Sequence, residues 1–250
     1  MSHGPYIAIL LFAFSISEAE PLTIAVTSSF TRPAQEIAAA YEGSSGNPVR
    51  MTTASTGKLY AQITNGAPFD IFLAADTQRP QLLERSGLGV AGTRFNYAIG
   101  SLVLWSLDPT LEAGSCKTAV DKLDSKRLAI ANPVTAPYGL AAMEFLQAQG
   151  VWEKVRPNLV YGENIAQTLH FVVSRNASLG LIAGSQAADV RLPDATCHWP
   201  VPASMHQPLD HQAILLQHAA GNRAATAFLR FLRDDDARQI IHAHGYRLPE

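Results

Sequence analysis

Short apolar runs alternate with amphipathic segments along most of the chain. Residues 22–26 read LTIAV, a run rich in β-branched side chains that predicts a buried strand. In residues 33–41 the apolar side chains recur every three or four positions, which predicts a helix. The same order returns in residues 49–53 and 58–64, and again in 70–74 and 79–86. Repeated strand, polar turn and helix predict a parallel sheet with helices on both faces.

The pattern changes after Gly87. Residues 97–105 form a longer apolar run, which predicts a strand that leaves the first group of elements. Further strands are predicted at 127–131, 159–161, 179–182 and 213–217, and further helices at 138–149, 164–174, 224–234 and 236–244. We expect an α/β fold of two lobes, each a mostly parallel sheet flanked by helices. The extended segments around 97–105 and 211–217 are the expected crossover strands.

The order of these elements also predicts the domain organisation. Lobe 1 is expected to comprise residues 20–99 and 210–250, and lobe 2 is expected to be inserted as residues 100–209. Residues 6–16 precede both lobes and read YIAILLFAFSI. They are too short for a bilayer, which needs about 20 residues, and have the length of a signal-peptide core. Residues 1–19 are therefore expected to be a signal peptide cleaved after Ala19, and a buried N-terminal strand is the alternative.

The charge balance argues against several classes of function. Nineteen Lys and Arg face 21 Asp and Glu, for a net charge of −2, so no basic face is expected and a nucleic-acid binder is disfavoured. No His or Cys stands at ligand spacing, so no metal-ion site is predicted. The motifs of serine hydrolases, zinc proteases and dinucleotide-binding enzymes are missing from the sequence, so we do not expect an enzyme.

The two cysteines suit an oxidising compartment. An even count in an exported chain favours a disulfide between Cys116 and Cys197. That bridge would close a loop of about 80 residues and contribute roughly 4 kcal/mol on the chain-entropy model. Two separate thiols are the alternative.

Four short polar connections follow predicted strands and open predicted helices. They are Thr27-Ser28-Ser29, Ala54-Ser55-Thr56-Gly57, the turn Thr135-Ala136-Pro137-Tyr138-Gly139, and Gly162-Glu163-Asn164-Ile165. Ligands of open α/β sheets bind at the carboxyl ends of strands, where helix N-termini expose unpaired N–H groups. Such groups hold a small anion without Lys or Arg, and serine hydroxyls add donors. Helix capping alone is the alternative for each of these serines.

At these same turns the sequence resembles the periplasmic molybdate-binding proteins of ATP-driven uptake systems. The most specific segment, residues 54–76, reads ASTGKLYAQITNGAPFDIFLAAD. The other matching segments, 22–30, 132–139, 162–169 and 179–187, follow in order and cover most of the chain. The resemblance implies two lobes joined by crossover strands that close over one tetrahedral oxyanion, molybdate or tungstate.

The resemblance also implies site residues. Ser28 and Ser55 match hydroxyl donors of the first lobe, and Ser29 is a neighbouring donor in some members. Tyr138 and Ile165 match positions that donate a backbone N–H. One position departs from the family: some members carry a tyrosine hydroxyl where this chain has Ala183. Either Tyr138 or Ser29 is expected to replace that donor, or the site takes a different anion.

The sequence therefore predicts an exported, monomeric, periplasmic binding protein that delivers molybdate or tungstate to an ABC-type membrane permease. The anion is cargo, so no cofactor is expected. A protein for another oxyanion or a small carboxylate is the alternative within this class. An exported α/β enzyme is a more distant alternative. The ligand-sensing domain of a transcription regulator is disfavoured, because the chain carries an export segment and lacks a basic arm.

Overall fold

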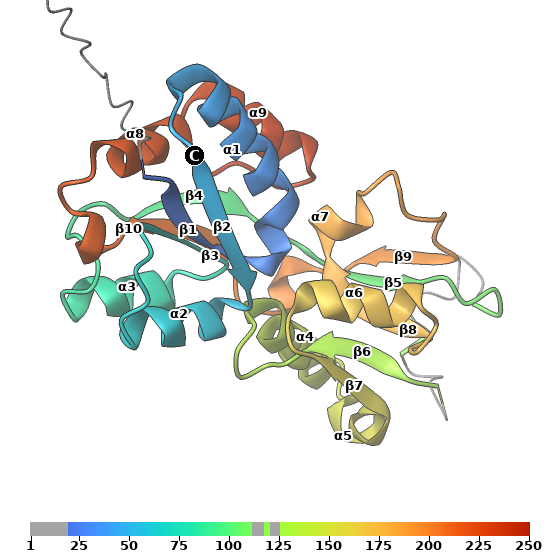
Figure 1. The fold of residues 1–250 in the computed structure, drawn as a ribbon. Coiled ribbons are helices and arrows are strands. Elements are labelled where there is room, and N and C mark those ends of the chain that lie inside the picture. Colours follow the sequence, from blue (N-terminus) through green and yellow to red (C-terminus); the bar gives the residue numbers. More distant parts are fainter. Residues whose placement is uncertain (1–19, 112–117, 121–125) are drawn as a thin grey trace, which may run out of the picture.

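The computed structural model describes residues 20–111, 118–120 and 126–250, which form two lobes side by side (Figure 1). The first lobe is built on a five-stranded sheet in the order β2-β1-β3-β10-β4. Its strands are β1 (Leu22–Thr27), β2 (Val49–Ala54), β3 (Ile71–Ala74), β4 (Phe95–Ile99) and β10 (Asp210–Leu215). β10 runs antiparallel to both of its neighbours, whereas β1 pairs in parallel with β2 and β3. The sheet is mixed, with four strands in one direction and one strand against them.

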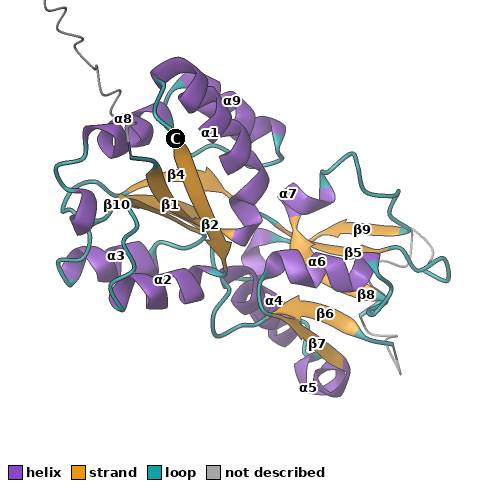
Figure 2. Cartoon of the chain, in the orientation of Figure 1, coloured by secondary structure: helices purple, strands orange, loops and turns teal. Residues whose placement is uncertain are grey.

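Helices cover both faces of this first sheet, as Figure 2 shows. They are α1 (Thr31–Ser45), α2 (Thr56–Thr64), α3 (Gln78–Arg85), α8 (Arg223–Phe231) and α9 (Asp235–Ala243). Alternate side chains of β1 point to opposite faces. Ile24 packs in the core that α1, α8 and α9 share, and Ala25 packs in the separate core beneath α2 and α3. Burial on both faces explains why the strand reads as an unbroken apolar run.

The second lobe repeats this plan. Its sheet has the order β7-β6-β8-β5-β9, with β5 antiparallel to both neighbours. The strands are β5 (Leu102–Ser106), β6 (Leu128–Ala131), β7 (Leu159–Gly162), β8 (Leu179–Ala183) and β9 (Cys197–Pro200). The helices are α4 (Pro137–Ala148), α5 (Trp152–Val155), α6 (Ile165–Val173) and α7 (Gly184–Ala187). Short 3-10 turns occur at Ser28–Phe30, Arg156–Asn158, Ala203–Met205 and Gln217–Ala219. The expected two-lobe α/β class with mostly parallel sheets is confirmed.

The crossovers differ from the sequence-based expectation. The apolar run 97–105 is two strands, because β4 belongs to the first sheet and β5 to the second, with Gly100 and Ser101 between them. Residues 211–217 are not a crossover, since β10 lies wholly within the first sheet. The chain returns before β10, where Leu209 accepts a hydrogen bond of 2.9 Å from the Gly100 amide. The run 97–105 looked continuous because its two halves enter two different buried cores.

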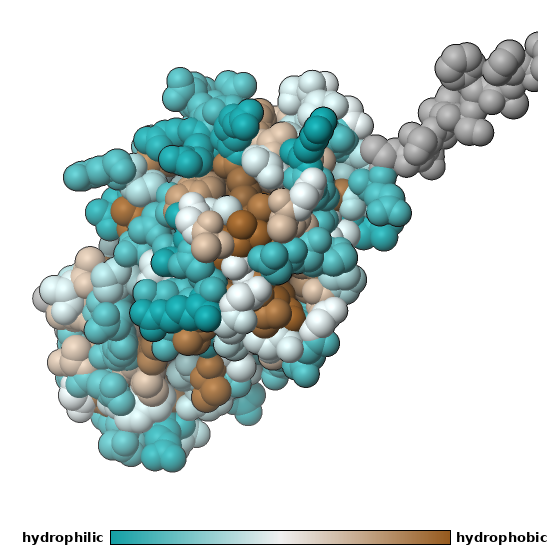
Figure 3. Space-filling model, turned by 90° about the vertical axis from the view of Figure 1, so that its left-hand side faces the viewer, coloured by the Kyte–Doolittle hydropathy of each residue, from teal (hydrophilic) through white to brown (hydrophobic). Residues whose placement is uncertain are grey.

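Hydrophilic and apolar residues are interspersed on the face of the molecule shown in Figure 3. In the view of Figure 3, teal residues surround smaller apolar patches, as expected where helices turn their polar faces outward. Within the residues described above, no helix has the length and apolar composition needed to cross a membrane. The predicted signal peptide, residues 1–19, and Cys116 both lie outside the described residues.

Candidate functional site

The four polar turns singled out in the sequence meet where the two lobes face each other. The Gly57 amide donates a hydrogen bond of 2.8 Å to the Thr135 carbonyl oxygen and so joins the second turn to the third. Lys58 and Glu163 form an ion pair that joins the second turn to the fourth. The 3-10 turn that contains Ser28 and Ser29 contacts both α6 and α7 of the opposite lobe. The lobes are thus in contact, and their strand ends share one boundary.

Three hydroxyl groups at this boundary are buried and have no hydrogen-bond partner among the residues that the structure describes. They belong to Ser29, Ser55 and Thr135. Ser29 and Ser55 are only 5% and 2% exposed, so bulk solvent has little access to them. A buried polar atom left unpaired costs about 1–3 kcal/mol. Three such atoms in turns that open helices indicate a site for a ligand that accepts hydrogen bonds.

Capping does not explain the serines. Ser55 is the residue that precedes the first turn of α2, yet its side chain makes no capping hydrogen bond. The 3-10 turn of Ser28 and Ser29 continues directly into α1, whose cap position is Phe30. Ser28 is partly exposed and lines a pocket of about 360 Å³ at the boundary, together with Ser29, Asn164 and Ser185. The serine side chains are therefore free to face a ligand.

Two helices of the second lobe begin with residues that can supply backbone donors. Ile165 is the first residue of α6, and Asn164 caps the amides of Ala166 and Gln167 with its side-chain oxygen. The Asn164 side chain does not accept a hydrogen bond from the Ile165 amide. Tyr138 is the second residue of α4, where a helix offers its amide no internal acceptor. Both positions present N–H groups at the positive end of a helix dipole.

The Tyr138 side chain takes a different direction from its amide. Its ring is 2% exposed and crosses into the first lobe, where the hydroxyl lies 3.3 Å from Nε2 of His211. Burial raises the pKa of Tyr138 well above its ordinary value, so the phenol keeps its proton. Burial also lowers the pKa of His211 to about 3, so the imidazole is neutral near pH 7.

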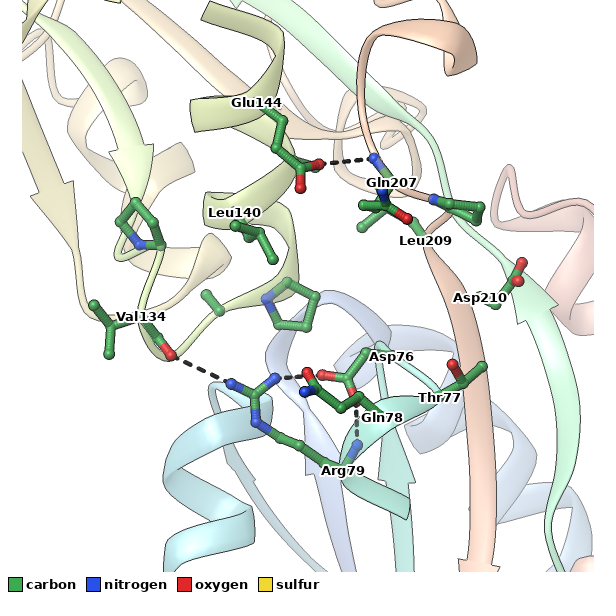
Figure 4. A pocket seen from close by; sticks show the side chains of 15 residues that line it. Asp76, Thr77, Gln78, Arg79, Val134, Leu140, Glu144, Gln207, Leu209 and Asp210 are labelled. Atoms are coloured by element: carbon green, nitrogen blue, oxygen red, sulfur yellow. Dashed lines mark hydrogen bonds and ion pairs between the residues drawn. The ribbon is translucent and has the colours of Figure 1, made fainter. Parts of the chain in front are cut away.

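A larger pocket of about 520 Å³ lies elsewhere between the lobes, and Figure 4 shows it from close by. Asp76, Glu144 and Asp210 line it. Its Arg79 is already paired with Asp76 and reaches the Val134 carbonyl oxygen at 3.3 Å. Carboxylates repel an anion, so this pocket is poorly suited to one.

Of the predicted residues, Ser28 and Ser29 line the boundary pocket. Ser55, Tyr138 and Ile165 stand at the starts of α2, α4 and α6 and are not among the residues that line it. At the remaining position of interest, Ala183 ends β8 and offers no hydroxyl. Sequence reasoning singled out the turn of Thr135 but not its hydroxyl group. It also assigned His211 no role in the site. Thr135 could have been found as a hydroxyl residue after a strand, whereas nothing near His211 in the sequence indicates its position.

Comparison with known proteins identifies relatives over most of the chain. The family model described as bacterial extracellular solute-binding protein matches residues 22–247. The molybdate-binding protein ModA of Rhodobacter capsulatus is 41% identical over 222 residues, which is 89% of this chain and 86% of that protein. The ModA protein of Azotobacter vinelandii is 41% identical over 233 residues, covering 93% of this chain and 92% of that protein.

Solved structures agree with this likeness. The periplasmic molybdate-binding protein of Azotobacter vinelandii superposes with a TM-score of 0.84 at 33% identity, covering 92% of this chain and all of that one. The sulfate-binding protein SubI of Mycobacterium tuberculosis has a TM-score of 0.73 at 12% identity, covering 92% of this chain and 87% of that one. The second likeness concerns the fold alone.

Proposed function

The chain belongs to the family of bacterial extracellular solute-binding proteins, and on that premise we propose that it binds a tetrahedral oxyanion, molybdate or tungstate. The bound anion lies between the lobes and is delivered unchanged to the membrane permease of an ATP-driven uptake system. The names of the relatives in Rhodobacter and Azotobacter support molybdate as the cargo.

The observation that carries this proposal is the set of three buried, unpartnered hydroxyls of Ser29, Ser55 and Thr135. Each hydroxyl can donate one hydrogen bond to an oxygen of a bound anion. Ser28 adds a fourth hydroxyl at the edge of the same boundary. A fully deprotonated tetrahedral oxyanion such as molybdate has four oxygen atoms and only accepts hydrogen bonds, so it suits a site that supplies mainly donors.

The backbone contributes the electrostatic part of the site. The amides of Tyr138 and Ile165 stand at helix N-termini, which favour negative charge. The cations Arg32 and Lys58 near this boundary are already paired with Asp189 and Glu163. We propose that neutral donors from both lobes hold the anion without a dedicated counter-cation.

Selectivity follows from size and protonation. Molybdate and tungstate have nearly the same size and charge, so one site accepts both. Sulfate is a smaller dianion and leaves some donors out of reach, at a cost of about 1–3 kcal/mol for each buried donor left unpaired. Phosphate retains a proton near neutral pH, and a site of donors offers that proton no acceptor.

Closure of the lobes is the proposed transport step. The open protein captures the anion, and the lobes rotate about the crossover segments until the permease can recognise the closed form. We propose residues 20–99 and 210–250 as lobe 1 and residues 100–209 as lobe 2. The membership of the strands in the two sheets supports these boundaries. We propose that the carrier acts as a monomer and does not bind nucleic acid.

We also propose that the protein works in the periplasm after cleavage of residues 1–19. The extracellular character of the family supports export. In that compartment we expect Cys116 and Cys197 to be joined, and Cys197 is buried at the start of β9. Thiol titration of the denatured, unreduced protein is expected to find no free thiol, and two free thiols would reject the bridge.

A thermal-shift panel with molybdate, tungstate, sulfate and phosphate tests the function. A ligand that binds only the folded state raises the melting temperature. Molybdate and tungstate are expected to raise it at micromolar concentrations, and sulfate and phosphate are expected to leave it unchanged. Calorimetry then measures the affinity and the stoichiometry of one anion per chain. Equal shifts with all four anions, or no shift with molybdate, would contradict the proposal.

A further inference from the structure

A buried cluster of rings joins the two lobes behind the proposed anion site. Tyr138 of the second lobe places its hydroxyl 3.3 Å from His211 Nε2, on β10 of the first lobe. The rings of Tyr97 and Tyr246 surround the imidazole, with centroids 5.7 and 5.1 Å from it. His211 itself has no exposed surface. The Tyr138 side chain is therefore anchored in the lobe opposite to its own backbone.

The hydroxyl of Tyr97 determines the tautomer of His211. Tyr97 donates its single proton to the Ala74 carbonyl oxygen at 3.1 Å. At the 3.3 Å contact between the Tyr97 oxygen and His211 Nδ1, the imidazole must then be the donor. A neutral imidazole carries one N–H, and here it is at Nδ1. Nε2 is consequently an acceptor.

The direction of the remaining hydrogen bonds follows. Since His211 Nε2 accepts, the Tyr138 hydroxyl is the donor in their contact, and its only proton is used there. The Tyr246 hydroxyl is likewise used, because it donates to the Ser29 carbonyl oxygen at 2.6 Å. The Ser29 hydroxyl, in contrast, makes no hydrogen bond of good geometry among the described residues. It lies near the hydroxyl groups of Tyr138 and Tyr246, where burial raises the pKa of each phenol and Ser29 lowers it by a smaller amount. Of the two candidates to replace the donor that Ala183 lacks, Ser29 has a proton available and Tyr138 does not.

Space around the tyrosine also confines its hydroxyl. A Cβ atom on Gly100, in the first crossover, would lie 2.2 Å from the Tyr138 hydroxyl oxygen. The Tyr138 hydroxyl therefore lies in close contact with the backbone of the crossover at Gly100. Its amide, at the other end of the residue, begins α4 at the lobe boundary. Anchoring the ring therefore also positions the N-terminus of α4.

We propose that His211 is a positioning residue of the anion site: it accepts the Tyr138 hydroxyl proton across the lobe boundary, holds the N-terminus of α4 against the cleft, and leaves Ser29 as the hydroxyl donor that compensates for Ala183. This inference rests on the proposed function. In this inference Tyr138 contacts the anion through its amide only. The effects of changing His211 and Tyr138 are then not independent of each other.

Calorimetric titration of sodium molybdate into the full chain tests the coupling. The variants are Y138F, H211L, the double variant Y138F/H211L and S29A. Y41F is the matched control, because Tyr41 also donates a buried hydroxyl bond, to the Ala224 carbonyl oxygen at 2.9 Å, within the first lobe.

We expect Y138F and H211L each to weaken binding by about 3- to 10-fold, the equivalent of one hydrogen bond. The double variant is expected to bind molybdate with about the same affinity as whichever single variant has the lower affinity, because both changes remove the same bond. S29A is expected to weaken binding by more than Y138F or H211L does. Y41F is expected to leave the affinity unchanged. A loss in Y138F that equals that in S29A, with no loss in H211L, would place the tyrosine hydroxyl on the anion and overturn the inference.

Nitrogen-15 spectra of the histidine-labelled wild-type protein supply a readout that does not depend on variants that fold. The Nδ1–H tautomer of His211 is expected before and after addition of molybdate. A change of tautomer, or loss of the Nε2 hydrogen bond on addition, would contradict the inference. If the wild-type protein takes up no molybdate at all, the proposed function fails, whereas the spectrum of the free protein still reports the tautomer.

Discussion

The amide nitrogen of Gly57 lies 2.8 Å from the carbonyl oxygen of Thr135, and this hydrogen bond connects the first lobe to the second. The approach is close enough to exclude a side chain. A Cβ atom on Gly57 would lie 2.8 Å from the Thr135 oxygen and 2.9 Å from its Cα atom. The lobes can therefore close as far as they do only because residue 57 is a glycine.

Gly57→Ala is expected to weaken molybdate binding by about 10-fold or more, since one lost interlobe hydrogen bond and steric overlap both oppose closure. Calorimetry measures the affinity. Gly43→Ala is the control, because nothing lies within 4 Å of a Cβ there and the residue is within α1. Gly43→Ala is expected to leave affinity unchanged and to stabilise the fold slightly. Equal affinities for both variants would show that the contact with Thr135 does not limit closure.

Ser55→Ala separates binding from folding. The Ser55 hydroxyl has no partner in the described part of the chain, so its removal is expected to leave the free energy of unfolding of the anion-free protein unchanged or slightly raised. Molybdate affinity is expected to fall by about 5- to 150-fold, the equivalent of about 1–3 kcal/mol for a buried donor. Calorimetry and urea unfolding give the two quantities. Unchanged affinity would remove Ser55 from the site.

The ion pair between Arg32 and Asp189 is expected to slow release of the anion. Arg32 lies on α1 of the first lobe and Asp189 lies on the second, and the Asp189 side chain is only 10% exposed. Burial by itself would raise the pKa of Asp189, but the hydrogen bonds from Arg191 and Arg32 outweigh it and lower that pKa to about 2. Asp189 is therefore charged at any pH at which the protein is expected to work.

Arg32→Gln is expected to raise the dissociation rate of molybdate by about 3-fold, since it removes a partly buried pair that forms across the cleft. The matched control is Lys58→Gln, whose pair with Glu163 is 49% and 59% exposed. Exposed pairs contribute little, so this control is expected to change the rate by less than about twofold. Stopped-flow displacement measures both rates. A larger effect in the control would mean that burial does not decide which pair matters.

His211 is expected to make stability depend on pH. Burial lowers its pKa from 6.5 to about 3, so the unfolded chain binds a proton between these values that the folded protein excludes. The free energy of unfolding should then rise with pH from about 3 to 6.5 and stay constant above, with a slope of up to about 1.4 kcal/mol per pH unit. His211→Gln does not titrate and should have a smaller slope. Urea unfolding from pH 4 to pH 8 measures the difference, and parallel curves would contradict the prediction.

The positions of the candidate donors at strand ends could be predicted because these residues stand in recognisable local contexts. Ser55 follows a strand and precedes a helix, and Asn164-Ile165 carries a cap signature that the structure retains. The crossovers were harder to place. The apolar run through Gly100 has no local mark of a change of sheet, because both of its halves are buried. β9, an edge strand with polar residues and a proline, gave no strand signal at all.

By itself, the sequence determined the alternation of strands, polar turns and helices, and with it the placing of serines and helix N-termini at strand ends. These features depend on residues only a few positions apart, so periodicity reveals them. Only the tertiary structure placed the Tyr138 hydroxyl beside His211, a residue 73 positions away, and left the Ser29 hydroxyl without a hydrogen bond of good geometry among the described residues. A hydroxyl group has one proton to donate, and its partner is decided by which distant segments are buried together.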